Sequence, residues 1–225
     1  MRLDAMLSHA GVGSRKEVQR LIKSRKVKVN NEVEVNISKN VNETDIISVD
    51  NKQINTEKYI YLMLNKPIGY TCTTELTEDS VMNIIPSEYK KKGLSPVGRL
   101  DKDSEGLLLL SNDGDFIHKI LSPKKHLQKT YFVQLKYSIK DEDILAFKEG
   151  ITLADGTKCL PAILEYTENE NEAIVKITEG KYHQVRRMMA ARDNFVEKLI
   201  RLKIGYYSLG NIRPGEIVKF YLEEK

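Results

Sequence analysis

The stretch GRLDKDSEGLLLLSNDGD, residues 98–115, carries the clearest structural pattern in the sequence. A polar loop with Asp101 leads into four consecutive leucines, Leu107 to Leu110, and a turn of Ser, Asn, Asp and Gly follows. A short apolar run bounded by turn residues is typical of a strand buried on both faces. Asp101 is therefore predicted to stand at the end of a buried sheet, where a lone Asp is more often a turn or cap residue than a catalytic one.

Strands and short helices are predicted to alternate on both sides of this stretch. The helical segments are short, so the crossovers of a dozen or more residues that parallel strands need are hard to place. We therefore expect an α+β domain with a largely antiparallel sheet over residues 59–225. Its further strands are YIYLMLNKP from Tyr59, KTYFVQLKY from Lys129, AILEYT from Ala162 and EAIVKITEG from Glu172.

A separate small α/β unit is predicted for residues 1–50. Ser14 to Glu17 reads SRKE, a capping-box pattern, and apolar residues at helical spacing follow it. Residues 26–35, KVKVNNEVEV, then alternate valines with polar residues around two asparagines, which is typical of a hairpin. Residues 51–58, NKQINTEK, are polar and show no apolar period, so we place a linker there.

Positive charge is concentrated in three blocks, although the net charge is only +4. Residues 1–30 hold eight Lys and Arg against two acids, residues 116–140 hold six lysines and no acid, and residues 181–203 hold seven against two. Such blocks can form one positive face for a phosphate backbone or three separately solvated surfaces, and charge alone leaves both open.

Composition argues against several other classes of protein. No apolar run approaches the roughly 20 residues that span a bilayer, and the N-terminus lacks the apolar core of a signal peptide, so a cytoplasmic location is expected. Cys72 and Cys159 lie far apart without CxxC spacing, and four histidines are scattered along the chain. We therefore expect neither a disulfide nor a metal site. No glycine-rich nucleotide loop is present in the sequence, so no nucleotide cofactor is expected.

The motifs taken together resemble a known family. GRLD followed by GLLLLSNDG resembles the signature motif of the pseudouridine synthases, and residues 2–30 resemble the S-four-like RNA-binding domain that precedes one branch of them. The resemblance implies that Asp101 is the catalytic carboxylate, with Ser104 and Ser111 in place of the usual threonines. It also implies that a uridine is flipped into a pocket and isomerised without a cofactor.

Further site residues follow from the same resemblance. Tyr131 in KTYFVQL matches the Tyr that packs against the flipped uridine, although in isolation an ordinary core tyrosine is favoured. Helical spacing alone does not tell whether Arg186 or Arg187 points toward the site. The resemblance implies that Arg186 forms an ion pair with Asp101, and such a pair would lower the pKa of that carboxyl. For His183, an RNA contact or a structural role is favoured over acid-base chemistry or metal binding.

The remaining predicted residues fall into two groups. The substrate pocket is expected to contain Arg99, Leu100, His183 and Leu202. RNA binding is expected of Arg2, Arg15, Lys16, Arg20, Lys23, Lys26 and Lys129.

The sequence also leans toward one substrate. SPKKHLQKTY, LPAILE and EGKYHQVRRM look like the branch that modifies small-subunit ribosomal RNA, by resemblance at uridine 516 in the standard numbering of 16S rRNA. The expected partner is 16S rRNA or an assembling small subunit, and a monomer is expected. Two alternatives remain, a synthase for 23S rRNA with the same chemistry and a non-catalytic ribosome-assembly factor that binds RNA through its basic face.

Overall fold

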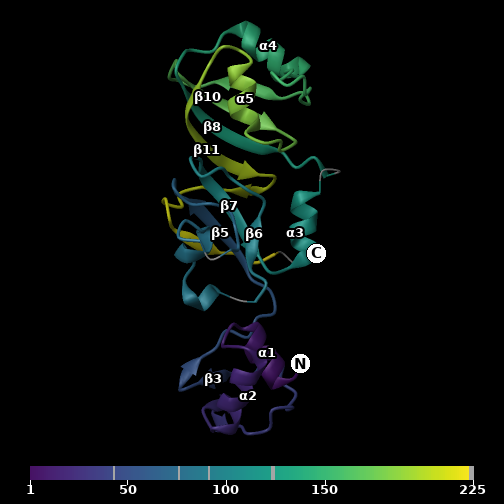
Figure 1. The fold of residues 1–225 in the computed structure, drawn as a ribbon, viewed down its shortest axis with the longest axis vertical. Coiled ribbons are helices and arrows are strands. Elements are labelled where there is room, and N and C mark those ends of the chain that lie inside the picture. Colours follow the sequence, from purple (N-terminus) through teal and green to yellow (C-terminus); the bar gives the residue numbers. More distant parts are fainter. Residues whose placement is uncertain (43, 76, 91, 123–124, 223–225) are drawn as a thin grey trace.

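The computed structural model describes residues 1–42, 44–75, 77–90, 92–122 and 125–222. Figure 1 shows a small unit at the N-terminal end of the long axis and a larger sheet-based unit above it. The predicted α+β class with a largely antiparallel sheet is confirmed. No helix in these ranges is long and apolar enough to cross a membrane.

The small unit packs two helices against a four-stranded antiparallel sheet of order β2-β1-β3-β4. The predicted capping box is confirmed, because the Glu17 N–H donates to Ser14 Oγ at 3.4 Å and the Ser14 N–H donates to Glu17 Oε2 at 2.7 Å. Leu7, Ile22 and Ile47 lie in its core. Its elements are α1 (Leu3–His9), α2 (Arg15–Lys23), β1 (Val27–Val29), β2 (Glu32–Val33), β3 (Ile47–Val49) and β4 (Lys52–Gln53).

Strand β4 lies inside the segment predicted as a linker, residues 51–58. It pairs with β3 through Ser48 with Gln53 and Val49 with Lys52, and Ile54 packs against the core of the small unit. The sheet of the first unit therefore extends beyond residue 50. Both residues of β4 are exposed, and an exposed edge strand of two polar residues has no apolar period by which sequence reasoning could find it.

The larger unit is built on a nine-stranded sheet whose main path runs β13-β5-β7-β11-β8-β10-β9. The four-leucine strand, β7, lies between β5 and β11 and is buried on both faces, as predicted. Among the described strand pairs only β7 and β11 run parallel. The strands are β5 (Tyr61–Lys66), β6 (Ser95–Val97), β7 (Glu105–Ser111), β8 (Lys129–Leu135), β9 (Ile163–Tyr166), β10 (Glu172–Ile177), β11 (Val196–Ile204), β12 (Tyr207–Ser208) and β13 (Ile217–Lys219).

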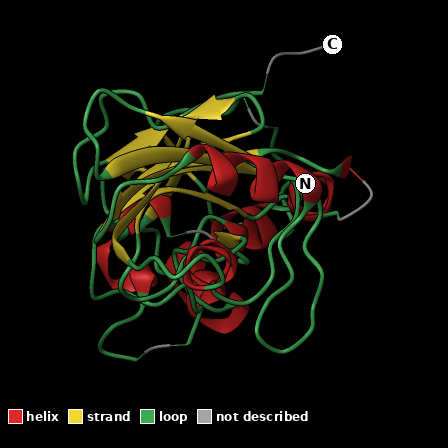
Figure 2. Cartoon of the chain, turned by 90° about the horizontal axis from the view of Figure 1, so that it is seen from above, coloured by secondary structure: helices red, strands yellow, loops and turns green. Residues whose placement is uncertain are grey.

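The core of this unit has three clusters, one around α4 and α5, one around α3 and one beside the 3-10 turns. Helices α4 and α5 accompany β8, β10 and β11 at one end, and α3 lies beside β6 and β7 at the other (Figure 1). Seen along the long axis in Figure 2, the strands turn progressively as one twisted layer. The helices are α3 (Gly114–Leu121), α4 (Asp141–Glu149) and α5 (Gln184–Ala190), with short 3-10 turns at η1 (Val81–Ile84) and η2 (Ser87–Tyr89).

The parallel contact of β7 with β11 depends on a glycine. Gly106 has a φ of 107°, and a Cβ built on it would lie 2.4 Å from the carbonyl oxygen of Arg201. No side chain fits that gap, so only glycine allows the two backbones to approach. This contact brings the loop before β7 next to the middle of β11.

Candidate active site

A pocket of about 640 Å³ opens between the core cluster around α5 and the core cluster around α3. Its walls come from the loop before β7, from β8 and β11, and from the turn that precedes α5. Among the residues predicted for the site or for RNA binding, Arg99, Leu100, Asp101, Lys129, Tyr131 and His183 line it. The fold thus gathers residues that are far apart in the sequence, on a scale that suits one nucleotide.

The loop that carries Asp101 is held from below by a buried lysine. Lys66, at the end of β5, is fully buried, and its Nζ donates to the carbonyl oxygens of Ser104 at 2.7 Å and Pro67 at 2.9 Å. Burial lowers the pKa of this ammonium group, while Cys72 and nearby carboxylates, Asp101 among them, act in the opposite direction. The loop backbone is therefore fixed by contacts that do not involve the Asp101 carboxylate.

Asp101 itself faces the pocket. Its carboxylate is 30% exposed, and Oδ1 lies 3.3 Å from Nε2 of His183. His183 precedes α5 in a left-handed backbone conformation, with φ 47° and ψ 35°. His183, which the sequence analysis placed in the substrate pocket and favoured as an RNA contact or structural residue, is thus the side chain that meets the carboxylate in the described structure.

The predicted ion pair between Arg186 and Asp101 is wrong. Arg186 Nη2 lies 3.0 Å from Asp103 Oδ2, two residues further along the loop, and Nη1 donates to the Val196 carbonyl oxygen at 2.9 Å. Helix α5 begins at Gln184 and turns its apolar residues into the core, which directs Arg186 along the side of the helix toward Asp103. The motif suggested Arg186 as the partner of Asp101. The direction in which the short helix α5 points its side chains brings Arg186 to Asp103 instead.

Leu202 was also placed wrongly. On β11 the residues that line the pocket are Leu199, Arg201 and Ile204, whereas Leu202 packs against the core that contains α3. Side chains on a strand alternate between its two faces, so Leu202 cannot share the face of Arg201. The register of β11 against β8 shifts between Arg201 and Lys203, which returns Ile204 to the pocket side.

Arg201 is a site residue that sequence reasoning missed. It is 3% exposed, its Nε donates to the Leu107 carbonyl oxygen at 2.8 Å, and its Nη1 donates to the Arg99 carbonyl oxygen at 3.0 Å. Nη2 is buried and has no hydrogen-bond partner among the described residues. The available signal was an arginine inside the apolar run LIRLKI, since an always-charged side chain in a buried strand is rare.

Tyr131 stands next to Arg201. The two residues are directly opposed on β8 and β11, so their side chains project from the same face of the sheet. Tyr131 is 7% exposed and belongs to the core that underlies the pocket. A ring in this position can support a base that enters the pocket, as the sequence predicted for Tyr131.

Basic side chains outnumber acidic ones in the pocket wall. Lys129 lines it, and burial together with the charge of Arg201 lowers the pKa of its ammonium group. The acidic residues of the wall are Asp101 and Glu179, against the basic side chains of Arg99, Lys129, Lys181 and Arg201. This excess of basic side chains favours a ligand that carries phosphate. Lys129, which was predicted as a general RNA-binding residue, lies in the pocket itself.

The other predicted RNA-binding residues lie on the small unit and are exposed. Arg2 contacts Asp4 at 3.1 Å and Lys26 contacts Asp50 at 3.3 Å. The exposed face of α2 carries Arg15, Lys16, Arg20 and Lys23.

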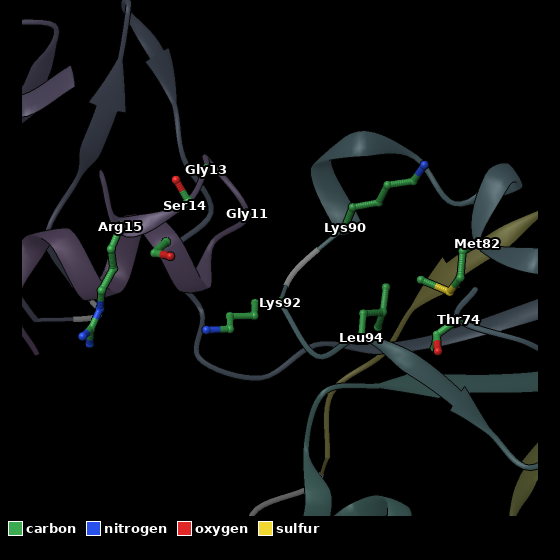
Figure 3. A pocket seen from close by; sticks show the side chains of 10 residues that line it. Gly11, Gly13, Ser14, Arg15, Thr74, Met82, Lys90, Lys92 and Leu94 are labelled. Atoms are coloured by element: carbon green, nitrogen blue, oxygen red, sulfur yellow. The ribbon is translucent and has the colours of Figure 1, made fainter. Parts of the chain in front are cut away.

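A second hollow, of about 600 Å³, lies between the small unit and the large one. Figure 3 shows Lys92 reaching from the large unit toward the helices of the small one, with Arg15 on the opposite side. The Lys92 N–H also donates to the His9 carbonyl oxygen at 3.3 Å. Basic side chains therefore continue from α2 across the junction of the units.

A pocket with an open carboxylate and a basic first unit suit an enzyme that acts on RNA, and comparison with known proteins identifies the class. Residues 60–191 match the model of the RNA pseudouridylate synthase family, and residues 1–47 match that of the S4 domain. The chain belongs to this family and is a pseudouridine synthase, an isomerase that acts on RNA.

Its relatives resemble it over nearly the full length. The chain is 40% identical to the uncharacterized RNA pseudouridine synthase YtzG of Bacillus subtilis, over 100% of this chain and 96% of that protein. It is 39% identical to the ribosomal small subunit pseudouridine synthase A of Vibrio parahaemolyticus, over 96% and 94%. It is 34% identical to the ribosomal large subunit pseudouridine synthase B of Bacillus subtilis, over 96% and 90%. A crystal structure of a pseudouridylate synthase matches with a TM-score of 0.67 at 33% identity, over 98% of this chain and 96% of that one.

Proposed function

We propose that this chain isomerises one uridine of 16S rRNA to pseudouridine, with Asp101 as the catalytic carboxylate. The observation that carries the proposal is the position of Asp101, on a loop anchored by Lys66 and Arg201, with its carboxylate open to a cationic pocket beside Tyr131. A fixed carboxylate at a cavity of nucleotide size is the arrangement that attack on, or proton removal from, a bound ribose requires.

The reaction would proceed in the pocket as follows. The target nucleotide leaves its stack, at a cost of a few kcal/mol, and its base packs against Tyr131. The Asp101 carboxylate assists cleavage of the bond between ribose C1′ and base N1, the held uracil rotates, and C1′ bonds to C5. The proton on C5 is then lost and N1 gains one, so the product is an isomer. The buried guanidinium of Arg201 fixes the loop backbone throughout.

The choice of 16S rRNA rests on similarity. Relatives named ribosomal small subunit pseudouridine synthase A are 39% identical to this chain in Vibrio parahaemolyticus and 37% in Vibrio vulnificus, against 34% for the ribosomal large subunit pseudouridine synthase B of Bacillus subtilis. By resemblance the target would be uridine 516. We further propose 16S rRNA or an assembling small subunit as the partner, with the enzyme acting in ribosome biogenesis. The cytoplasmic location, the monomeric state and the division into residues 1–50, 51–58 and 59–225 stay predictions.

Mapping pseudouridines in ribosomal RNA tests the target. Total rRNA would be compared between cells with the gene, cells without it, and deletion cells that carry the wild-type gene on a plasmid. We expect one 16S site to lose its pseudouridine on deletion and to regain it on complementation. Loss of a 23S site instead would favour the large-subunit alternative, and an unchanged map in both RNAs would favour the non-catalytic assembly factor.

A further inference from the structure

An exposed aromatic stack stands at the mouth of the pocket. Tyr182 is 75% exposed, and its ring lies on that of His183, with centroids 3.9 Å apart and an angle of 17° between the planes. Both residues line the pocket, and Nε2 of His183 contacts Asp101. One face of the Tyr182 ring is covered by the histidine, so the stack extends outward from the carboxylate toward solvent.

The turn that carries the stack is held by a polar network. The Glu179 carboxylate accepts hydrogen bonds from the Leu160 N–H at 2.9 Å, from Gln184 Nε2 at 2.6 Å and from Lys181 Nζ. Burial raises the pKa of Glu179, but these hydrogen bonds outweigh it and hold the pKa below its usual value. Gln184 Oε1 also accepts from the Lys181 N–H at 2.8 Å, which closes the turn on itself.

This network maintains a backbone conformation that a histidine rarely adopts. A non-glycine residue with φ of 47° is strained, and such strain persists only where the surroundings enforce it. The strained turn places a large, mostly uncovered ring at the entrance to the pocket. A left-handed backbone at His183 and an exposed aromatic ring at Tyr182 are both unfavourable. Together they indicate a surface that receives a partner, because packing alone would not produce them.

We propose that Tyr182 and His183 form a stacking platform for the unpaired base next to the target uridine. The inference rests on the proposed function. When the target is flipped into the pocket, its neighbour in the RNA loses a stacking partner, and an exposed aromatic face at the entrance can replace it. Stacking of this kind tolerates any base, so the platform would position the strand and not read its sequence. Tyr182 is thus a positioning residue for the RNA beside the pocket.

Substitution of the ring tests the platform. The variants are Tyr182→Ala, Tyr182→Phe and, as a control of similar exposure away from the pocket, Tyr221→Ala, since Tyr221 is 71% exposed. Each would be assayed by tritium release from a transcript labelled at uridine C5, of 16S or 23S rRNA, whichever the wild-type enzyme modifies. We expect Tyr182→Ala to raise the half-saturating RNA concentration about tenfold with the rate at saturation within threefold of wild type. Tyr182→Phe and Tyr221→Ala should stay within twofold of wild type.

A second substrate separates stacking from a structural role. In the same transcript, the base on the 5′ or the 3′ side of the target is replaced by an abasic nucleotide. On one of these two substrates, the half-saturating RNA concentration of wild type should rise to the value that Tyr182→Ala shows on intact RNA. The half-saturating concentration of Tyr182→Ala itself should not rise further on that substrate. The platform would be overturned if Tyr182→Ala raised the half-saturating concentration, relative to wild type, by the same factor on intact and on abasic RNA. It would also be overturned if Tyr182→Phe bound RNA as weakly as Tyr182→Ala. Absence of tritium release by wild type from both transcripts would count against the proposed function instead.

Discussion

The pocket of the large unit and helix α2 of the small unit are both basic, but they use positive charge in opposite ways. Around the pocket, Lys66 and Arg201 are buried and donate to backbone carbonyl oxygens. On α2, Arg15 and Arg20 and their neighbours are exposed. A buried cation costs several kcal/mol of desolvation unless its donors are satisfied, so it is kept where it fixes geometry. An exposed cation fixes little, but it attracts phosphate at long range.

The comparison implies different losses when each kind of residue is changed. Residues around the pocket should affect the chemical step or the stability of the fold, whereas residues of α2 should affect RNA affinity and its dependence on salt.

The largest effect is expected from Asp101→Asn. The amide has nearly the same shape but cannot act as a carboxylate, so single-turnover tritium release should fall by about 10³-fold or more with RNA affinity within threefold of wild type. Asp103→Asn is the matched control, because Asp103 lies in the same loop and pairs with Arg186 outside the pocket wall. It should retain activity within tenfold. Comparable losses in the two variants would mean that loop geometry, and not the Asp101 carboxylate, supplies the rate.

A smaller loss, shared between activity and stability, is expected from Arg201→Met. The change removes two hydrogen bonds to carbonyl oxygens, those of Arg99 and Leu107, and should lower the free energy of unfolding by about 2 kcal/mol. Because the Arg99 carbonyl lies two residues before Asp101, the single-turnover rate should fall at least tenfold. Urea unfolding and tritium release measure the two losses.

Arg20→Met, on the exposed face of α2, is the control for Arg201→Met. It should change the free energy of unfolding by less than about 0.5 kcal/mol and leave the rate at saturating RNA unchanged. Arg201→Lys keeps the positive charge but loses the fork of the guanidinium. One ammonium group cannot reproduce both hydrogen bonds in the same geometry, so this variant separates the effect of charge from that of hydrogen bonding. If Arg201→Met were as stable and active as wild type, the buried cation would not position the loop.

The same division explains what the sequence could predict. The strand Leu107 to Leu110, the capped helix after Ser14 and the position of Tyr131 follow from local patterns that burial enforces, and all three have the predicted structure. The partner of Asp101 does not follow from any local pattern, because it depends on how the turn before α5 is wound. His183 reaches Asp101 because its own backbone is left-handed, a conformation that the hydrogen bonds around Glu179 maintain.

Arg201 and β4 were missed for different physical reasons. Arg201 stands inside an apolar strand, and only the third dimension shows that its hydrogen bonds go to the backbone on either side of the Asp101 loop. The two residues of β4 are polar and exposed, so their pairing with β3 has no apolar signal. Sequence patterns report burial well, but they report polar contacts between distant segments poorly.

The smallest effect on catalysis is expected from α2. Replacing Arg15, Lys16, Arg20 and Lys23 by Gln removes four exposed charges and leaves the buried Val18 and Ile22 in place. RNA affinity at moderate salt should fall about tenfold or more, while the rate at saturating RNA stays within twofold of wild type. If all four side chains contact phosphates, the slope of log affinity against log salt should become shallower by about 3, since each phosphate contact contributes about 0.7 to 0.9. Filter binding across a salt series measures the slope.

The salt slope tests most directly whether α2 and the pocket use positive charge differently. A quadruple variant that loses affinity with an unchanged slope would have lost shape or hydrogen bonds, and α2 would then act through geometry as the pocket does. A variant that keeps the wild-type affinity and slope would leave phosphate binding to other basic residues, such as Lys90 and Lys92 at the junction of the units. Only a shallower slope with an unchanged rate at saturation assigns long-range attraction to the first unit, because counterion release depends on the number of neutralised phosphates and not on the chemistry at Asp101.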